Sequence, residues 1–295
     1  MKTWLENEHI PFVENVSLKE YTTLHIGGRC RLLIEPKKEG QIRNVIRKLN
    51  EEGRSYVILG RGSNVLINDQ KELDVVLHFL DNYNVIQQYD EERILCQCGA
   101  LNSDVAAFCL EHQLSGYEFA CGIPGSVGGS VLMNAGAYDG QMDQIFESCR
   151  ILDDRGRIHV LHKENLDFRY RHSGIEGLIL EVVFCLKKGS YASIRSKMEE
   201  LTKKREAKQP LDVYSAGSTF KRPKGSYASK LIDAAGLRGF SYGDCSVSDK
   251  HTGFLINRGN GTYEQFNTLI QLVQKKVYDQ FQIQLECEIK RIGGE

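Results

Sequence analysis

The spacing of apolar residues near the N-terminus predicts a strand, a helix and a second strand in succession. Residues 30–35 form a short apolar run that ends before Pro36, which indicates a strand. The next segment predicts a helix, because its apolar residues recur at helical spacing, at Ile42, Val45, Ile46 and Leu49. Residues 56–59 predict the second strand, which runs into a glycine-rich turn. A unit of this kind indicates an α/β or α+β fold.

Beyond residue 73 the pattern predicts mainly short strands with a few helices. Helices are predicted at 103–114, 191–207, 227–235 and 263–280, and strands at 178–186 and 282–292. Asp153-Asp154-Arg155-Gly156 lies between two alternating runs and predicts a hairpin turn. The helix at 191–207 has few apolar residues, so we expect a connector rather than a core helix. We predict three domains, at 1–72, 73–205 and 206–295; the first two form one cofactor-binding body, and the last is a smaller α/β domain.

The chain has 38 basic and 39 acidic residues, so its net charge is close to zero. This balance excludes a long-range attraction to nucleic acid or to an anionic membrane. A local basic pocket for a phosphorylated ligand remains compatible with this balance. No apolar run approaches the roughly 20 residues that span a bilayer. The first eight residues carry acids where a signal peptide has an apolar stretch. We therefore expect a cytoplasmic monomer with neither a membrane nor a nucleic-acid partner.

The nine cysteines are odd in number and scattered through predicted strands and helices. In a reducing compartment this distribution is typical of small apolar core residues rather than of disulfides. Cys96 and Cys98 face the same side of a predicted strand, but a zinc site needs two more ligands at suitable spacing. We expect no metal site.

Two glycine-rich loops are the strongest candidates for a binding site. The first is Gly60-Arg61-Gly62-Ser63-Asn64, directly after a strand, and the second runs from Gly122 to Ser130. Glycine lets backbone amides approach an anion closely, so both loops suit a pyrophosphate, although each also fits an ordinary tight turn. Neither loop has the Gly-Lys-Ser/Thr of a Walker loop, and the first lacks the spacing of a Rossmann dinucleotide site. The residues alone indicate a phosphorylated cofactor.

Eight stretches in order along the chain carry a resemblance to a known family. They are Tyr21-Thr22-Thr23 with Ile26-Gly27-Gly28, Leu59 to Leu66, Gly122 to Gly129, Met133 to Tyr138, Tyr170-Arg171-x-Ser173, Ala216-Gly217-Ser218-x-Phe220-Lys221, Val247-Ser248-x-Lys250-His251, and Leu285-Glu286-x-Glu288. With them the chain resembles the UDP-N-acetylenolpyruvoylglucosamine reductase family over nearly its full length. The segment between residues 175 and 210 is too short for the substrate-covering subdomain of longer members, so the resemblance is to the shorter class.

The resemblance implies an α+β fold with an FAD-binding body of the vanillyl-alcohol-oxidase type and a smaller C-terminal substrate domain. Both glycine loops then hold FAD. The first loop contains no His, the residue that sometimes attaches FAD covalently in this fold, so we expect dissociable FAD; Cys121 is the alternative attachment point. The cofactor-binding residues implied are Leu59, Gly60, Arg61, Gly62, Ser63, Asn64, Val65, Gly122, Ile123, Pro124, Gly125, Ser126, Gly128, Gly129, Asn134, Ala135 and Gly136.

The implied activity is that of a UDP-N-acetylmuramate dehydrogenase in bacterial cell-wall synthesis. NADPH reduces FAD, and a hydride from flavin N5 then goes to the terminal carbon of the enolpyruvyl ether of UDP-N-acetylglucosamine enolpyruvate. Negative charge develops on the neighbouring carbon and its carboxylate, and that carbon then takes up a proton. The site therefore needs a cationic or hydrogen-bonding clamp and a proton donor.

Three residues match the family's catalytic positions. Arg171 matches the arginine that stabilises the enolate. The alternative is a surface ion pair, which is what most arginines form. Ser218 matches the proton donor, although a serine after Gly217 also fits a turn. Glu288 matches the third catalytic residue. Beside a substrate carboxylate we expect its side chain to hold a proton. The alternative is an ordinary exposed glutamate, because Glu288 lies on a predicted strand whose apolar residues face the other side.

Basic residues near residue 206 are candidates for the UDP diphosphate. We expect Arg205, Lys208 and Lys221 to contact it, although charged helix ends are also commonly solvated. Arg222 stands where the family usually has Asn, so it either takes over a diphosphate contact or points to solvent. Tyr170 is a candidate substrate contact or a core aromatic, and we expect a structural role for His251.

Two rival hypotheses remain open. An FAD oxidase of the same fold would use O2 and would not need Arg171, Ser218 and Glu288 together. A catalytically silent relative would bind FAD or a UDP-sugar as a sensor.

Overall fold

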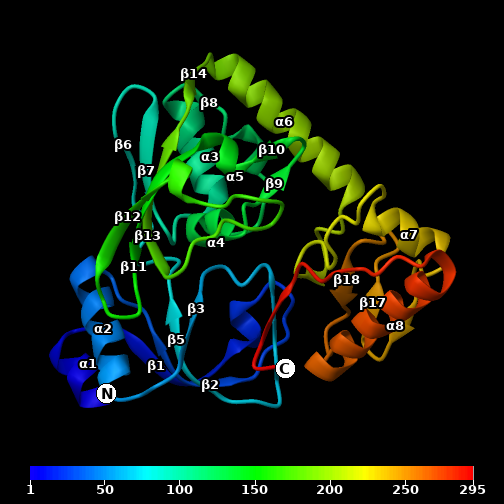
Figure 1. Cartoon of the computed structure of the whole chain (residues 1–295), viewed down its shortest axis with the longest axis horizontal. Coiled ribbons are helices and arrows are strands. Elements are labelled where there is room, and N and C mark those ends of the chain that lie inside the picture. Colours follow the sequence, from blue (N-terminus) through cyan, green and yellow to red (C-terminus); the bar gives the residue numbers. More distant parts are fainter. Residues whose placement is uncertain (295) are drawn as a thin grey trace. The chain divides into compact units, whose positions relative to one another are not determined.

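The computed structural model describes residues 1–294, which form two compact units (Figure 1). The first unit comprises residues 1–14, 32–61 and 74–205, and the second comprises residues 15–31, 62–73 and 206–295. The change of unit after Arg205 coincides with the start of the predicted C-terminal domain, but two N-terminal segments also join that domain. In the part of the chain that the structure describes, no helix combines the length and apolar character needed to cross a membrane.

The first unit contains the predicted strand–helix–strand segment. Strands β3 and β5 pair in parallel, and they belong to a sheet of order β1-β2-β5-β3. Helix α2 buries Ile42, Val45, Ile46 and Leu49, which confirms the predicted apolar stripe. These elements are α1 (Lys2–Asn7), β1 (Phe12–Ser17), β2 (Arg29–Ile34), α2 (Glu39–Glu51), β3 (Tyr56–Leu59) and β5 (Leu73–His78).

A five-stranded antiparallel sheet of order β12-β11-β13-β7-β6 dominates the rest of the first unit. In Figure 1 the helices α3, α4 and α5 lie along this sheet. The predicted hairpin joins β11 to β12, and α6 buries only Ile194 and Leu201, as expected for a connector. The elements are β6 (Ile86–Gln88), β7 (Arg93–Gln97), α3 (Asn102–Glu111), β8 (Leu114–Ser115), α4 (Val127–Leu132), β9 (Gly136–Ala137), β10 (Gly140–Gln141), α5 (Met142–Ile145), β11 (Phe146–Leu152), β12 (Ile158–His162), β13 (Leu178–Cys185), β14 (Lys187–Lys188) and α6 (Tyr191–Lys208).

Asn102, at the start of α3, fixes the second glycine loop to the core of the first unit. Its side chain is fully buried, and Nδ2 donates to the Ile123 carbonyl at 3.2 Å and to Ser130 Oγ at 2.8 Å. Its Oδ1 accepts from the Tyr117 hydroxyl at 3.0 Å, and its backbone N–H donates to the Gly125 carbonyl at 3.1 Å. Three hydrogen bonds from one buried residue therefore fix the loop at both ends and in the middle, and the fourth joins this residue to Tyr117.

In the second unit, helix α8 packs against a small antiparallel sheet of order β15-β18-β17-β16, and helix α7 packs against α8. Helix α8 buries Phe266, Leu269, Ile270, Val273 and Val277, and Leu24, Ile26 and Leu66 join the same core. Strand β19 pairs in parallel with β4. The elements are β4 (Val65–Ile67), β15 (Tyr214–Ser215), α7 (Ala228–Ala234), β16 (Ser241–Tyr242), β17 (Cys245–Val247), β18 (Leu255–Asn257), α8 (Tyr263–Phe281) and β19 (Lys290–Ile292).

The predicted strand at 282–292 is wrong for most of its length, since only Lys290–Ile292 forms a strand. Gln282 has a left-handed φ of 55°. The segment that follows lies beside residues 219–221, where Lys221 N–H donates to the Glu286 carbonyl at 2.8 Å. Leu285 and Ile289 are buried at alternating-strand spacing, so the apolar pattern is satisfied by packing without a continuous ladder.

His251 is hydrogen-bonded within the second unit. Its Nδ1 accepts a hydrogen bond from Gly253 N–H at 3.2 Å, and the Gly253 carbonyl in turn accepts from Thr219 N–H at 3.0 Å. Burial lowers the pKa of His251, and the charges of Arg238 and Lys208 act in the same direction. The neutral ring is therefore the form that the folded protein stabilises.

We predict that Asn102→Ala lowers the free energy of unfolding by about 2 kcal/mol, because it leaves buried groups of Tyr117 and Ser130 without a partner. Tyr117→Phe, which removes only one of these hydrogen bonds, should lower it by about 1 kcal/mol. Urea denaturation of the three proteins measures both values. Equal stability of Asn102→Ala and the unmodified protein would contradict this role for Asn102.

We also predict a pH-dependent contribution of His251 to stability. Because the folded-state pKa of His251 is lowered, its contribution is fully present above the ordinary histidine pKa of 6.5 and is lost as the pH falls through the folded value. Thermal unfolding should therefore show a larger loss of stability for the unmodified protein than for His251→Asn between about pH 7.5 and about pH 5. Parallel losses in the two proteins would contradict the prediction.

Candidate functional site

The two glycine loops meet inside the first unit, at Gly60 and Ser126. A Cβ atom added to Gly60 would lie 2.3 Å from Ser126 Oγ, a distance that real Cβ atoms do not show. Ser126 is buried, and helix α4 begins directly after it. Gly128 is equally restricted, since a Cβ there would lie 2.8 Å from Cys98 Cβ. The two loops therefore pack directly against each other, and a side chain at Gly60 or Gly128 would collide with buried protein atoms.

The remainder of the first loop, Gly62 to Asn64, belongs to the second unit. Gly62 has a φ of +65°, and an added Cβ would lie 2.1 Å from the Tyr21 carbonyl oxygen. Its own carbonyl accepts from Thr23 N–H at 3.2 Å. The Tyr21-Thr22-Thr23 motif thus packs directly on the loop, which requires glycine at residue 62.

Arg205, in α6, lies against the second glycine loop. An added Cβ on Gly122 would lie 2.9 Å from Arg205 Cδ. Burial lowers the pKa of the Arg205 guanidinium, and no acidic side chain of residues 1–294 forms an ion pair with it. A half-buried cation beside a glycine loop suits an anionic ligand. Cys121, next to the loop, has a pKa raised by burial, which disfavours a reactive thiolate.

Arg171 occupies a tight turn of the first unit in which Arg169 and His172 exchange backbone hydrogen bonds of 2.9 and 3.1 Å. Its φ of +58° lies in the left-handed region, which costs a non-glycine residue about 1 kcal/mol. The guanidinium donates to the Gly136 carbonyl at 3.2 Å and to the Asn134 carbonyl at 3.5 Å, and it lies 4.7 Å from the centroid of the Tyr170 ring. This strain and these contacts distinguish Arg171 from an ordinary surface arginine.

Ser218 and Glu288 lie on neighbouring segments of the second unit. Glu288 N–H donates to the Thr219 carbonyl at 2.9 Å. Next to this bond, Phe220 and Cys287 form an isolated antiparallel β-bridge. Thr219 is fully buried, and its hydroxyl accepts from Leu255 N–H at 3.1 Å. Both Ser218 and Glu288 are partly exposed, so this buried threonine fixes two accessible polar groups.

The first loop also connects to the segment of Glu288. Asn64 Nδ2 donates to the Glu288 carbonyl at 3.4 Å, and the Asn64 carbonyl accepts from Lys290 N–H at 3.0 Å. The parallel pairing of β4 and β19 continues this contact. The second unit thus brings Asn64, Ser218 and Glu288 onto one connected framework.

Two of the other predicted basic residues of the second unit, Lys221 and Arg222, have partners on the protein. Lys221 pairs with Glu286, whose side chain is 72% exposed. Arg222 lies over the ring of Tyr227, with its Cζ atom 4.0 Å from the centroid, and Lys208 is exposed. Arg222 is therefore not simply solvated, since its guanidinium stacks on an aromatic ring.

The two units divide the predicted site residues between them. The first unit contains Arg171, Tyr170, Arg205, the second loop and residues 134–136, whereas the second contains Ser218, Glu288, Lys208, Lys221 and Arg222. The sequence did not identify Asn102, which holds the second glycine loop, or Thr219, which holds the segment of Ser218. Neither residue gave a distinguishing signal, because Asn102 stands in the polar run Asn102-Ser103-Asp104, which is typical of any helix start.

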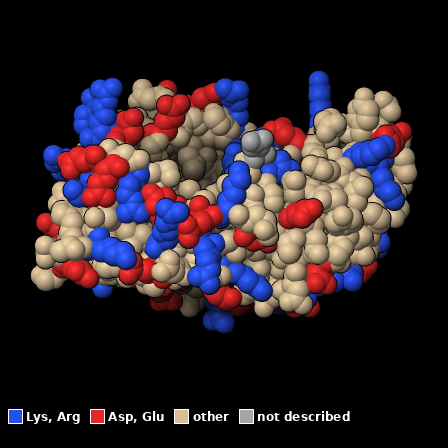
Figure 2. Space-filling view, turned by 90° about the horizontal axis from the view of Figure 1, so that it is seen from below, with Lys and Arg blue, Asp and Glu red and all other residues tan. Residues whose placement is uncertain are grey.

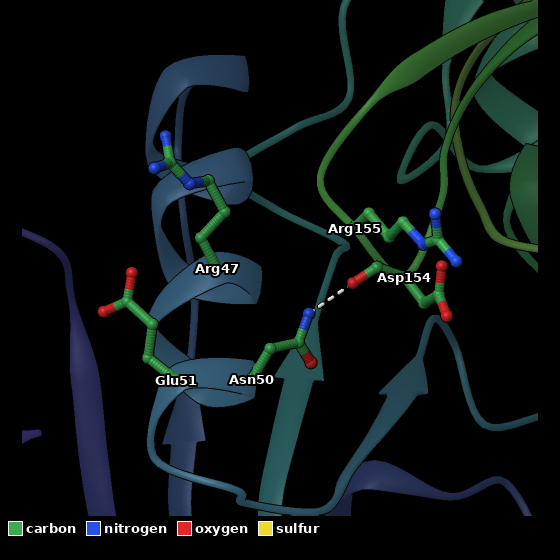
Figure 3. Close-up of a pocket in the computed structure, with 5 residues that line it drawn as sticks. All are labelled: Arg47, Asn50, Glu51, Asp154 and Arg155. Carbon is green, nitrogen blue, oxygen red and sulfur yellow. Dashed lines mark hydrogen bonds between the residues drawn. The ribbon is translucent and has the colours of Figure 1, made fainter.

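A shallow surface pocket lies elsewhere, between α2 and the turn after β11 (Figure 3). Its volume is about 400 Å³, and its lining residues are Arg47, Asn50, Glu51, Asp154 and Arg155. The lining carries two positive and two negative side chains, and Asn50 donates to the Asp154 carbonyl. Positive and negative side chains are likewise mixed over the face in Figure 2. This pocket contains none of the predicted site residues.

The fold and these motifs match known proteins along almost the whole chain. A model of the FAD binding domain matches residues 30–162, which confirms FAD as the expected cofactor. A model of the C-terminal domain of UDP-N-acetylenolpyruvoylglucosamine reductase matches residues 209–292.

Individual relatives agree with the domain matches. The UDP-N-acetylenolpyruvoylglucosamine reductase of Clostridium kluyveri is 43% identical over 279 residues, covering 94% of this chain and 91% of its own. That of Clostridium perfringens is 43% identical over 281 residues with the same coverage. The crystal structure of the Thermus caldophilus reductase has a TM-score of 0.80 at 30% identity and covers 96% of this chain and 98% of its own. The predicted α+β fold with an FAD-binding body of the vanillyl-alcohol-oxidase type is confirmed, and the chain belongs to the UDP-N-acetylenolpyruvoylglucosamine reductase family.

Proposed function

We propose that the protein uses NADPH to reduce UDP-N-acetylglucosamine enolpyruvate to UDP-N-acetylmuramate, with Arg171, Ser218 and Glu288 as the catalytic residues. The observation that carries this assignment is the 2.9 Å hydrogen bond from Glu288 N–H to the Thr219 carbonyl, which joins the segments of two of these residues. Membership of the reductase family makes the reaction class the expected one.

The residues of the glycine loops fit an FAD pyrophosphate. The contact of Gly60 with the buried Ser126 holds the two glycine loops together, and their glycines let backbone N–H groups approach a diphosphate closely. Bound FAD supplies the hydride that reaches the terminal carbon of the enolpyruvyl ether. The first loop lacks His and the Cys121 pKa is raised by burial, which supports dissociable rather than covalent FAD.

Arg171 stabilises the negative charge that develops on the substrate carboxylate and its neighbouring carbon. A guanidinium offers two parallel N–H donors to a carboxylate, and the turn that contains Arg171 restricts its backbone. Rigid positioning of a charged donor favours the transition state over the more weakly charged substrate.

Ser218 delivers a proton to the neighbouring carbon, and Glu288, holding a proton, donates a hydrogen bond to the substrate carboxylate. A serine hydroxyl is a weak acid, so it needs a developing carbanion of higher basicity as its acceptor. The left-handed φ of Gly217, +75°, and the buried Thr219 on the other side support a fixed Ser218.

Arg205 is the strongest candidate for a diphosphate contact. Its half-buried guanidinium lacks an ion-pair partner among the described residues, whereas Lys221 already pairs with Glu286. Lys208, Lys221 and Arg222 contribute more weakly to the UDP moiety, because their charges are more exposed to solvent or engaged on the protein. Tyr170, beside Arg171, is a further substrate contact.

We predict that Arg171→Lys and Ser218→Ala each slow reoxidation of the reduced flavin by the enolpyruvyl substrate about 100-fold, because each removes an interaction of the transition state. Reduction of the flavin by NADPH should stay within about twofold, since neither residue takes part in it. Anaerobic stopped-flow absorbance measures both half-reactions.

Arg169→Lys is the matched control, because Arg169 lies in the same turn but pairs with Asp167. It should leave both half-reactions nearly unchanged. Equal effects of Arg169→Lys and Arg171→Lys would contradict the specific role of Arg171.

We further predict that Gly60→Ala raises the dissociation constant of FAD at least about tenfold, because the new methyl group collides with Ser126 Oγ. Adding Ser126→Ala removes the colliding oxygen, so the double variant should bind FAD more tightly than Gly60→Ala alone, and Ser126→Ala by itself measures the separate cost of losing a predicted cofactor contact. Gly40→Ala is the control, because a Cβ there meets nothing within 4 Å. Flavin fluorescence titration of the apoproteins measures these constants, and unchanged binding by Gly60→Ala would refute the contact.

A further inference from the structure

Asn134 is a buried polar residue whose side-chain amide is used at both ends. It is 1% exposed. Its Nδ2 donates to the Arg169 carbonyl at 3.0 Å, and its Oδ1 accepts from Asp143 N–H at 3.0 Å. A buried amide with both ends paired resists rotation, because any other orientation would leave a buried group without a partner.

The same residue contacts the Arg171 turn in two ways. The Arg169 carbonyl that accepts from the Asn134 side chain is also the carbonyl that accepts from His172 N–H and closes the turn. The Asn134 main-chain carbonyl accepts from the Arg171 guanidinium at 3.5 Å. Asn134 therefore contacts both the base of the turn and the charged end of its central arginine.

Both residues have left-handed backbones, with φ values of +40° at Asn134 and +58° at Arg171. Asparagine tolerates this conformation better than most residues, because its short side chain can hydrogen-bond locally. Nearby, the buried Ser173 donates through Oγ to the Leu132 carbonyl at 3.0 Å. Residues 132–136 thus contact residues 169–173 at several points, and the amide of Asn134 is central to that contact.

We propose that Asn134 is a positioning residue for Arg171: its amide holds the turn closed and its carbonyl orients the guanidinium toward the developing enolate. This inference rests on the proposed catalytic role of Arg171. It also gives Asn134 a role besides the cofactor contact predicted from the sequence, since both ends of its amide are already bonded to protein groups.

The test compares the two half-reactions in Asn134→Gly, which keeps the carbonyl and the left-handed backbone but removes the amide. Reoxidation of the reduced flavin by the enolpyruvyl substrate should slow about 100-fold, the scale of effect expected for a small misplacement of a catalytic group. Both half-reactions are followed in FAD-saturated protein, because Asn134 is also a predicted cofactor contact. Reduction by NADPH should stay within about threefold, because it does not depend on Arg171. A merely structural role would slow both half-reactions together, which would overturn the proposal.

A double-variant comparison tests whether Asn134 acts through Arg171. In an Arg171→Ala background, Asn134→Gly should slow reoxidation by no more than about twofold further, since the group that it positions is absent. A further loss as large as in the unmodified background would overturn the proposal. Val182→Ala, a buried change in β13, controls for general destabilisation and should not slow reoxidation selectively.

A measurement without turnover separates this inference from the proposed function. In NMR spectra of protein with ¹⁵N-labelled arginine, Arg171→Lys identifies the Arg171 Nε–H signal by its loss. Asn134→Gly should shift that signal toward the position of free arginine and speed its exchange with solvent. Asn134→Asp serves as a second variant if the glycine variant does not fold, because it keeps the acceptor but not the donor to Arg169. An unchanged Arg171 signal would overturn the inference, whereas failure of the unmodified enzyme to reduce the substrate would overturn the proposed function alone.

Discussion

The close approach of Gly60 to Ser126 is the constraint on which the cofactor site depends. With 2.3 Å between an added Cβ and the serine oxygen, the two loops can lie together only if residue 60 has no side chain. The contact joins the end of β3 to the start of α4, which are far apart in the sequence. Asn102 then holds the second loop through its bonds to Ile123, Gly125 and Ser130. The proposed surface for the FAD pyrophosphate therefore rests on contacts of Gly60, Ser126 and the buried Asn102 within the first unit.

The proposed chemistry requires a cation and a proton donor, and the residues proposed for these roles belong to different units. Arg171 belongs to the first unit, and Ser218 and Glu288 belong to the second. In each unit a buried polar residue fixes the accessible ones: Asn134 bonds to the Arg171 turn, and Thr219 bonds to the segment of Glu288. Buried hydrogen bonds of this kind restrict the rotamers and backbone of the residues that they support, which is the basis of a preorganised site.

Much of the fold could be predicted from the sequence, because apolar periodicity reports burial directly. Helix α2 was predicted from an apolar stripe at Ile42, Val45, Ile46 and Leu49. The connector α6 was predicted from the small apolar content of residues 191–207. The motif residues indicated the family. The strand predicted at 282–292 was mostly wrong, because Leu285 and Ile289 are buried by packing without a ladder, and periodicity cannot distinguish the two. Asn102 and Thr219 act through tertiary hydrogen bonds, whose partners are distant in sequence, so no local pattern identifies their roles.

The most direct test of the account is a single turnover of the unmodified protein. Its bound FAD is reduced anaerobically with NADPH, the excess NADPH is removed, and UDP-N-acetylglucosamine enolpyruvate is added while the flavin absorbance and the product mass are recorded. The account predicts rapid return of the oxidised flavin band together with one UDP-N-acetylmuramate per FAD. A flavin that stays reduced in folded, FAD-loaded protein would contradict it, and would favour an oxidase or sensor that kept the scaffold and changed its ligand.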